Sequence, residues 1–384
     1  MKATAQPREV FEFDRNMRSP VLTALTQNDF ADAETTPLRG VEATIVNPFR
    51  EQEWDQWVDS HPENTIFHSS AWARVLAETY NHRPCYLRLC ARGALVALVP
   101  IMEVHSLITG CRGVCLPFTD YCSPLLFNRF SKAFVFDKVG QVARERSWSY
   151  FEIRGDSIML EDAIASESYY GHRLDLRPGS ARLFAAFASS VQRAIRKAER
   201  SGLLVSVHSD PEAMHQFYQL HARTRQRHGV PPQPRSFFAS IQRNIINAGL
   251  GFTVLVSQGT RAIAAAMFFR RKSHAIYKFG ASDERAQELR PNNLAMWKAI
   301  DLLANSGVET LHFGRTEILN EGLRRFKRSW GATEEPINYF KFKTLNNSWI
   351  TPSKTTLRFH RKIFRLLPVT VNRLAGAMIY PHLD

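Results

Sequence analysis

The sequence predicts an α/β protein with two domains, from its length, its apolar content and one strand-helix-strand run. The chain has 384 residues, which is long for one domain and ordinary for two. Hydrophobic residues make up 44% of the chain and aromatic residues 11%, enough to fill sizeable cores. In residues 274–331 a strand pattern is followed by a helical repeat and a second strand, the order typical of α/β folds.

The clearest elements lie within this run. Residues 274–282 alternate between two faces, as in a β-strand. Residues 290–293, Arg-Pro-Asn-Asn, are expected to start and cap a helix, and Gly307 is expected to end it. Between them apolar residues repeat at helical spacing: Leu294, Trp297, Ile300, Leu303 and Ala304. Trp297 is expected to pack in the core and not to stack on a ligand.

The first half of the chain shows shorter elements. Residues 1–40 mix charges with three prolines and lack the apolar core of a secretory signal, so we expect a disordered leader. From residue 41 onward, helices are expected at 51–58 and 70–80, and strands at 84–89 and 94–104.

Charge is divided unevenly along the chain. Residues 1–175 contain 18 Lys and Arg against 23 Asp and Glu, a balance of −5. Residues 176–384 contain 32 against 13, a balance of +19. This asymmetry indicates an anionic partner such as phosphate, RNA or acidic lipid.

The five cysteines all lie in the first half and are odd in number. Together with the missing export signal, this predicts reduced thiols in the cytoplasm. No second cysteine pair or histidine cluster accompanies Cys111 and Cys115, so no metal site is expected.

The second half begins with an Ala- and Arg-rich helix expected at 181–201. Its basic residues Arg193, Arg196, Lys197 and Arg200 fall on one stripe. Such a stripe is either a solvated face or a contact for phosphate or RNA. A further helix is expected at 211–228, where His228 is either a C-terminal cap or a catalytic residue.

Three stretches resemble a known family: Tyr-Lys-Phe-Gly-Ala-Ser at 277–282, residues 293–300, and Asn-Glu-Gly-Leu-Arg-Arg-Phe-Lys-Arg-Ser-Trp-Gly at 320–331. They resemble Fem-type transferases, bacterial enzymes with a GNAT-like (acetyltransferase-like) fold that join amino acids to peptidoglycan precursors. They are also similar to the acetyltransferase-like branch associated with exopolysaccharide assembly. The most specific part is the Gly-Leu-x-x-Phe-Lys signature, and the resemblance covers roughly residues 41–345.

The resemblance implies two GNAT-like lobes in tandem that share a central cleft. The expected division is a leader at 1–40, a first lobe at 41–175, a second lobe at 176–345 and a basic amphipathic segment at 346–384. The Pro-containing loop 229–234 is expected to line substrate, as a comparable loop does in such families.

The resemblance also implies catalytic residues. Lys327 matches the family's lysine and is expected to be an exposed residue of the cleft that stabilises an oxyanion or holds a substrate phosphate, the alternative being an ordinary basic turn. Asp120, in the loop 116–124, is expected to orient or deprotonate an attacking amine, the alternative being a turn cap. The expected substrate-binding residues are Tyr121, Arg223, Lys278, Arg290, Asn293, Arg315 and Arg325.

The implied reaction is acyl or aminoacyl transfer to a phosphate-bearing or lipid-linked precursor of the cell envelope or of exopolysaccharide. Acyl-coenzyme A or aminoacyl-tRNA is the expected donor, with no permanently bound cofactor, and RNA is a partner only in the second case. Pro291 removes a backbone amide where ordinary acetyltransferases hold the coenzyme A pyrophosphate, leaving Arg290 and Asn293 to bind an anion there. The chain has no room for the long helical hairpin of classical Fem-type members, which weakens the aminoacyl-tRNA interpretation.

Two other functions stay open. One is a coenzyme A-dependent N- or O-acyltransferase of exopolysaccharide assembly, and the other is a non-catalytic RNA- or membrane-binding module. A cleft that joins Asp120, Lys278 and Lys327 favours an enzyme, whereas a flat basic face favours a binding module.

The segment 353–384 interleaves apolar residues with six cations: Lys354, Arg358, Arg361, Lys362, Arg365 and Arg373. Its apolar runs are too short to span a bilayer, but a basic amphipathic segment can bind to the bilayer surface. We expect a cytoplasmic protein attached peripherally to the inner membrane face, with packing against the second lobe or nucleic acid as alternatives.

Overall fold

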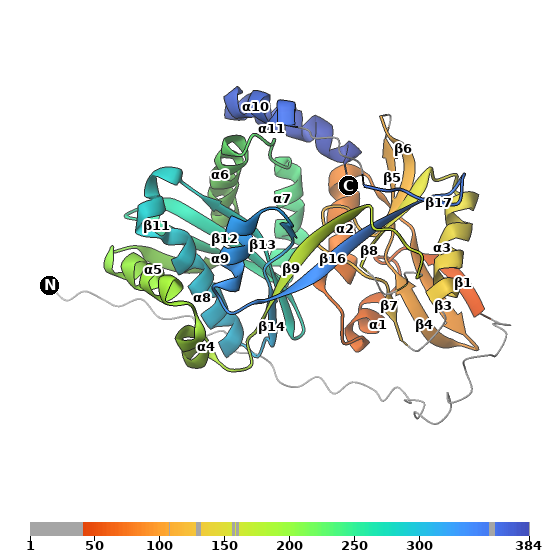
Figure 1. The fold of residues 1–384 in the computed structure, drawn as a ribbon, viewed down its shortest axis with the longest axis horizontal. Coiled ribbons are helices and arrows are strands. Elements are labelled where there is room, and N and C mark those ends of the chain that lie inside the picture. The colour runs from red at the N-terminus through yellow and green to blue at the C-terminus, as the bar shows by residue number, and fades with distance from the viewer. Residues whose placement is uncertain are drawn as a thin grey trace. The chain divides into compact units, whose positions relative to one another are not determined.

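The computed structural model describes residues 41–384 except 107, 128–131, 156–157, 159–160, 353–357 and 384, and no side chains at 358–361. The predicted leader, residues 1–40, lies outside the described residues. Figure 1 shows the helices and strands. Those of the first lobe are β1 (Val41–Val46), α1 (Trp54–Ser60), α2 (Ser70–Tyr80), β2 (Arg83–Pro84), β3 (Tyr86–Ala91), β4 (Ala94–Val99), β5 (Met102–Ser106), β6 (Gly110–Val114), β7 (Leu125–Leu126), α3 (Lys132–Glu145) and β8 (Tyr150–Arg154).

The chain continues from the end of the predicted first lobe, 41–175, through the second lobe to the C-terminal segment. The elements there are β9 (Glu167–Asp175), α4 (Ser180–Ala186), α5 (Ser189–Arg200), β10 (Leu204–His208), α6 (Pro211–Arg227), α7 (Arg235–Ile241), β11 (Gly251–Gln258), β12 (Arg261–Arg271), β13 (His274–Ser282), α8 (Pro291–Asn305), β14 (Thr310–His312), β15 (Thr316–Glu317), α9 (Glu321–Arg328), β16 (Thr333–Lys343), β17 (Ser348–Trp349), α10 (Arg358–Leu366) and α11 (Val369–Ile379). Short 3-10 turns are Ile66–His68, Glu284–Leu289 and Tyr380–His382, and Gln242–Ile246 is π-helical.

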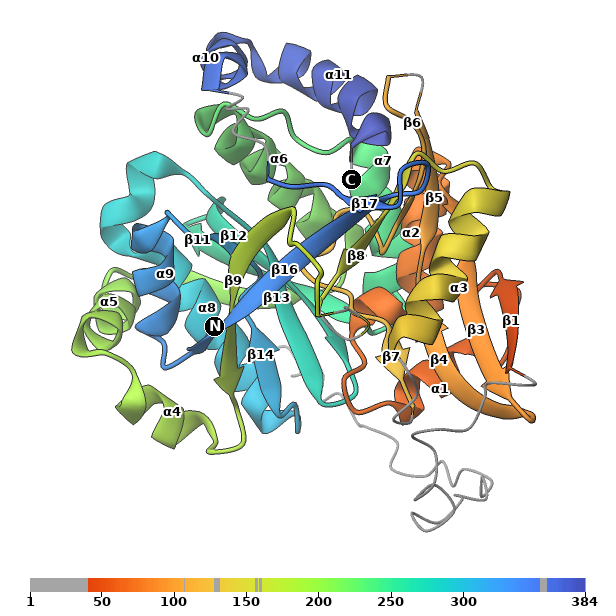
Figure 2. The same cartoon turned by 45° about the vertical axis from the view of Figure 1, so that its right-hand side comes forward.

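One large sheet runs through both lobes, in the order β10-β11-β12-β13-β14-β9-β16-β8-β6-β5-β2. The long strand β16 makes the connection, because Tyr339 is paired with Glu167 of β9 on one side and Arg154 of β8 on the other. Figure 2 shows β16 crossing between the two halves. The chain thus returns from the second lobe to complete the sheet of the first.

The first lobe also has a separate four-stranded antiparallel sheet, β1-β3-β4-β7. The predicted strand 94–104 is in fact two strands, β4 and β5, which belong to different sheets. Pro100 lies between them, and because proline lacks an N–H it cannot continue a ladder. The predicted helix at 70–80 is confirmed as α2, which buries Trp72, Val75 and Leu76.

Helices cover both faces of the second-lobe sheet. On one face α5 and α8 pack over Val254, Ala264 and Phe268, and on the other α6 and α7 lie over Leu255 and Met267. Neighbouring strand residues point to opposite faces, so one sheet contributes to two cores.

The strands β13 and β14 lie side by side for only three residue pairs, from His274 and Thr310 to Ile276 and His312. Beyond that point β13 continues along β12 as far as Ser282, whereas the chain turns away after His312. The two strands therefore separate in the middle of the sheet, and Lys278 and Arg315 lie at this separation.

One local prediction is wrong. The helix expected at 181–201 is divided into α4 and α5, because Phe187 has an extended backbone and packs its ring against Trp297 and Trp330. The predicted start of α8 is confirmed: the helix begins at Pro291 with Arg290 as its N-cap residue, although no side chain forms a cap hydrogen bond. Its predicted end is confirmed, since Gly307 follows with φ +80°.

The C-terminal helices pack against the second lobe. Asn372, Gly376 and Tyr380 recur every four residues on the buried face of this segment. Tyr380 Oη donates to the carbonyl of Pro231 and accepts from Arg225 of α6, at 3.1 and 2.8 Å. Among the described residues, no helix combines the length and apolar character needed to cross a bilayer.

Candidate active site

A buried ion pair lies where β13 and β14 separate. Lys278 Nζ on β13 is 2.7 Å from Asp120 Oδ2, and the side chains are 7% and 15% exposed. Burial opposes ionisation of Asp120, but the charge and hydrogen bond of Lys278 outweigh it and lower the pKa of Asp120 to about 2. Burial also lowers the pKa of Lys278 from its usual 10.5. Asp120 therefore bonds residues distant in sequence and does not cap its own turn.

Lys327 lies on α9 and is bound to the same region. Its Nζ donates to the carbonyl oxygens of Gly314 and Arg315, at 2.8 and 3.2 Å. The residue is only 4% exposed, so the expectation of an exposed cleft lysine is wrong. The cause is that α9 packs its Lys327 face inward over the turn that follows β14. Burial lowers the pKa of Lys327 to about 8, although the charge of Asp120 opposes this shift.

Arg315 connects this pair to a set of tyrosines. Its backbone N–H donates to Asp120 Oδ1 at 3.1 Å, and its Nη1 donates to Tyr339 Oη at 2.7 Å. The guanidinium lies 4.4 Å from the ring centre of Tyr169. Tyr339 Oη donates in turn to the backbone carbonyl of Asp120, at 2.7 Å. The network thus joins the strand β16 to the loop that carries Asp120.

Tyr339, Tyr169 and Arg154 also belong to this network, although no local sequence pattern predicts them as site residues. Arg154 lies 4.7 Å from the ring centre of Tyr339 and bonds Glu152, so it extends the polar network into β8. On their own, these residues look like ordinary members of alternating strands. Only the insertion of β16 between β8 and β9 brings them to Asp120.

A small polar cavity of about 160 Å³ lies beside this network and is lined in part by Tyr121. The Tyr121 ring is 4.5 Å from that of His312, which also lines the cavity together with His68. Burial raises the pKa of Tyr121 and lowers that of His312. It lowers the pKa of His68 to about 4. Tyr121, His312 and His68 therefore line the cavity as neutral rings at neutral pH, together with the charged residues Glu63 and Arg173.

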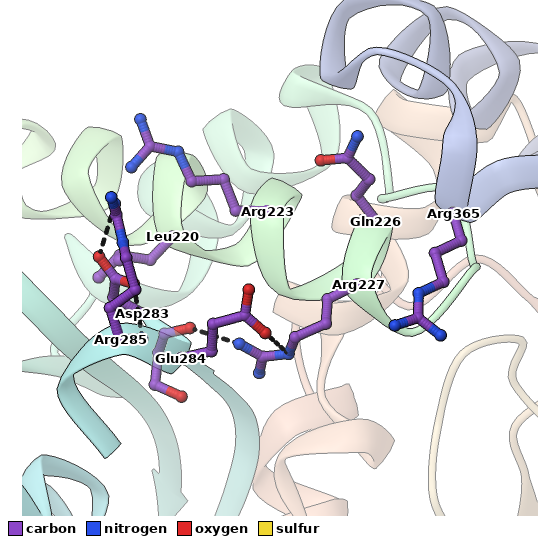
Figure 3. A pocket seen from close by; sticks show the side chains of 9 residues that line it. Leu220, Arg223, Gln226, Arg227, Asp283, Glu284, Arg285 and Arg365 are labelled. Atoms are coloured by element: carbon purple, nitrogen blue, oxygen red, sulfur yellow. Dashed lines mark hydrogen bonds and ion pairs between the residues drawn. The ribbon is translucent and has the colours of Figure 1, made fainter. Parts of the chain in front are cut away.

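A second cavity, of about 570 Å³, contains another predicted residue, Arg223. It lies at the end of β13, between α6 and α10 (Figure 3). Neither Asp120 nor Lys327 lines it. The structure therefore separates Arg223 from the ion pair and places it in a site of its own.

The remaining predicted residues do not join either group. Arg290 is exposed at the N-cap of α8, Asn293 is half-buried in the first turn of that helix, and Arg325 is exposed on α9. In the described part of the chain none of them has a hydrogen bond or ion pair with Asp120, Lys278 or Lys327. Their roles in substrate binding stay predictions.

One group of described side chains has the composition of a metal site. Glu103, His105 and Cys111 place their ligand atoms within 4.8 Å of one another on β5 and β6. However, the Glu103 carboxylate already accepts from Trp148 and Arg146, at 2.8 and 3.2 Å. These bonds give Glu103 a structural role. All five cysteines are free.

Comparisons with known proteins agree with this architecture. Residues 185–328 match the family model of the acetyltransferase (GNAT) domain. A comparison with curated proteins finds no match. Among solved structures, the crystal structure of FemX superposes with a TM-score of 0.60 at 14% identity, covering 77% of this chain and 96% of FemX.

Two further structures share the two-lobed arrangement. L-PGS from Bacillus licheniformis has a TM-score of 0.51 at 14% identity, covering 85% of this chain and 97% of its own. A tandem GNAT protein of the clavulanic acid biosynthesis pathway has a TM-score of 0.50 at 9% identity, covering 82% and 100%. These likenesses confirm the predicted fold of two GNAT-like lobes, and the family match confirms the predicted class of enzyme. Residues 185–328 therefore match an acetyltransferase (GNAT) domain, and the described chain has a two-lobed fold like those of FemX and L-PGS.

Proposed function

We propose that this protein transfers an acyl or aminoacyl group to a phosphate-bearing or lipid-linked precursor of the cell envelope or of exopolysaccharide. The observation that carries the proposal is the buried Lys327, held on the GNAT domain next to the Asp120–Lys278 pair. The structures of FemX and L-PGS support it as relatives in fold. Asp120, Lys278 and Lys327 lie together, as the enzyme interpretation requires, but they do not line either of the two described cavities.

In this reaction an amine or hydroxyl of the acceptor attacks the activated carbonyl of the donor. A new C–N or C–O bond forms as the bond from the carbonyl carbon to the donor's leaving group breaks, and the nucleophile's proton passes to that leaving group or to water. The carbonyl oxygen gains negative charge on the way, and a cation in a buried site stabilises that charge strongly. With a pKa of about 8, Lys327 is mostly protonated at pH 7 and suits this role.

Asp120 suits orientation better than proton abstraction. Its pKa of about 2 makes it a weak base, because Lys278 and the Arg315 N–H both favour the carboxylate. The same contacts fix its position against the 314–315 backbone. We therefore assign Asp120 to holding this backbone and the acceptor's nucleophile in place.

The donor is acyl-coenzyme A or an aminoacyl-tRNA, and neither is held as a permanent cofactor. Pro291 at the start of α8 lacks the N–H that an anion would use at a helix N-terminus, which disfavours the ordinary coenzyme A grip. The cations of α5, Arg193, Arg196, Lys197 and Arg200, are exposed on one face and suit an RNA donor. The second candidate is a coenzyme A-dependent N- or O-acyltransferase of exopolysaccharide assembly.

The C-terminal helices suit an anionic bilayer surface. Val371, Leu374 and Met378 recur at i, i+3 and i+7 on α11 and are exposed by 42%, 67% and 74%. They lie on the side away from the buried Asn372 and Gly376. The segment 353–383 contains six cations and no Asp or Glu. Peripheral attachment would bring the active site to a lipid-linked acceptor.

The test starts with mass spectrometry of the small molecules and lipids that co-purify with the full chain. The identified donor and acceptor classes are then used in a transfer assay with the natural protein, a Lys327→Met variant and a Lys327→Arg variant. We expect Lys327→Met to lose activity and Lys327→Arg to keep part of it. Full turnover by a folded Lys327→Met protein would refute the assignment.

A further inference from the structure

The larger cavity gathers arginines from three separate parts of the chain. It is bordered by α6, by the end of β13 with the turn after it, and by α10. Figure 3 shows Arg227 and Arg365 reaching into the space from facing elements. Four arginines line the cavity, against two acidic residues: Arg223, Arg227, Arg285 and Arg365, against Asp283 and Glu284.

The two acidic residues are already neutralised. Asp283 pairs with Arg261 and with Arg285, the latter at 3.2 Å. Glu284 lies 4.0 Å from Arg227. Positive charge therefore remains in the cavity after all of its carboxylates are paired.

That positive charge belongs to Arg223 and Arg365. Within the described residues neither forms an ion pair, and both side chains are exposed to the cavity. A guanidinium group without a carboxylate partner is ready to donate paired hydrogen bonds to phosphate oxygens.

Hydrogen bonds hold the C-terminal segment in place beside this cavity. Gln226 of α6 donates to the carbonyl of Leu367, directly after α10, at 2.6 Å. Asn372 donates to the carbonyls of Phe364 and Leu367, at 2.7 and 3.3 Å. These bonds hold the end of α10, and with it Arg365, over the end of α6.

The cavity is distinct from the other places where an anion would bind. It lies on the α6 face of the sheet, whereas α8 packs on the opposite face. It shares no lining residue with the small cavity beside Tyr121.

We propose that this cavity binds a phosphate or pyrophosphate group of the substrate, and that Arg365 of α10 completes the site. The proposal rests on the proposed function, which requires a phosphate-bearing substrate. A soluble phosphate ester and a lipid phosphate present the same phosphate oxygens, so both are candidate ligands. Leu366, next to Arg365, is 85% exposed on the outer surface, where a lipid would lie. The C-terminal segment then acts as part of the binding site as well as a surface anchor.

The first experiment measures binding of inorganic pyrophosphate to the full chain by isothermal titration calorimetry. The variants are Arg223→Gln and Arg365→Gln, with Arg182→Gln as the control, because Arg182 is exposed on α4 outside the cavity. Each cavity variant should weaken binding by about tenfold or more, as loss of a charge-assisted hydrogen bond predicts, while the control is unchanged. Equal affinities for all four proteins, or an equal loss in the control, would overturn the proposal.

The second experiment identifies the source of the phosphate. Full-length protein is sedimented with vesicles of phosphatidylcholine alone or with added phosphatidic acid, with and without excess pyrophosphate. Competition by pyrophosphate that depends on Arg223 and Arg365 supports a lipid phosphate in the cavity. Pyrophosphate binding that leaves sedimentation unchanged supports a soluble ligand.

Neither experiment requires turnover, so the proposed phosphate site and the proposed function are tested independently of each other. Arginine-dependent pyrophosphate binding in a protein that transfers nothing would contradict the function and keep the site. Active transfer to a phosphate-bearing acceptor with no effect of either arginine variant would contradict the site alone. Circular dichroism of each variant confirms folding, which we expect to be unchanged because both side chains are exposed.

Discussion

Asp120 and Lys327 bind the same short piece of backbone from distant parts of the chain. Asp120 Oδ1 accepts the N–H of Arg315 at 3.1 Å, while Lys327 Nζ donates to the carbonyl of Gly314 at 2.8 Å. Gly314 has φ +72°, and a Cβ there would approach Asp120 Oδ1 to 3.0 Å. This turn therefore fixes the two charged groups relative to each other, and only glycine fits it without strain.

The burial of Lys327 predicts a loss of stability on truncation. In Lys327→Ala the carbonyls of Gly314 and Arg315 lose their donor, at a cost of about 1–3 kcal/mol. Arg325→Ala, on the exposed side of the same helix, should change the free energy of unfolding by less than about 0.5 kcal/mol. Urea unfolding of both variants checks this, and equal stability of the two would show that Lys327 is not anchored.

The lowered pKa of Lys327 predicts how transfer depends on pH. If the protonated amine stabilises the oxyanion, the rate should fall as pH rises through about 8, because the cation is lost there. A Lys327→Arg variant should keep its residual rate to higher pH, since arginine stays charged. A rate that rises through pH 8 in the natural protein would instead identify Lys327 as a general base.

The lowered pKa of Asp120 predicts that protonation of this residue contributes to acid denaturation. Its folded pKa, about 2, is below the ordinary 3.8, so its contribution to stability is present above pH 4 and is lost as pH falls towards 2. Asp120→Asn should be less stable than the natural protein at pH 7, and the difference should shrink below pH 4. Asp162→Asn, at an exposed position, is the control. A pH-independent difference for Asp120→Asn would argue against the ion pair.

The partial burial of Trp297 predicts a moderate loss of stability when its side chain is truncated. It is half-buried and packs its ring against Phe184 and Phe187, at centroid distances of 5.1 and 5.7 Å. Trp297→Ala should cost about 2 kcal/mol, less than the roughly 3–5 kcal/mol expected for the fully buried Trp330→Ala. Thermal unfolding compares the two. Unchanged stability of Trp297→Ala with lost substrate binding would show that this ring contacts a ligand.

Gly376 predicts how α11 is attached. A Cβ at this position would overlap the backbone carbonyl of Pro232, so Gly376→Ala should loosen α11 from the loop after α6. Hydrogen exchange of residues 369–379 should become faster than in an Ala377→Ser control, which changes an exposed position of the same helix. Equal exchange would mean that the helix shifts without detaching.

The outer face of the C-terminal helices predicts binding to anionic vesicles. Replacing Leu366, Leu374 and Met378 by Gln should reduce sedimentation with anionic vesicles. The binding of the natural protein should weaken with salt, because each cation near the surface is worth roughly 1 kcal/mol and is screened. Leu319→Gln with Leu345→Gln is the control, since both residues are exposed by more than 90% elsewhere. Negligible sedimentation of the natural protein would leave packing as the segment's role.

The sequence by itself determined the elements whose pattern is local. Alternation over nine residues predicted β13, and a helical repeat ending at glycine predicted α8, because the spacing of apolar residues follows directly from helix and strand geometry. The Gly-Leu-x-x-Phe-Lys motif likewise pointed to the second lobe, where the GNAT match lies.

The tertiary structure alone decided which of these residues meet. Asp120 and Lys278 are 158 positions apart, and Tyr339 is 219 from the Asp120 carbonyl to which it donates. Their contact depends on where β16 inserts into the sheet, which no local spacing encodes. The same holds for the break at Phe187, which follows from its packing on Trp297 and Trp330. It also holds for Arg365, which lines the same cavity as Arg223 only because α10 packs against α6. The burial of Lys327 is also a tertiary effect. In the sequence Lys327 is one of several neighbouring cations. Packing of α9 over residues 314–315 buries its side chain, and this burial lowers its pKa.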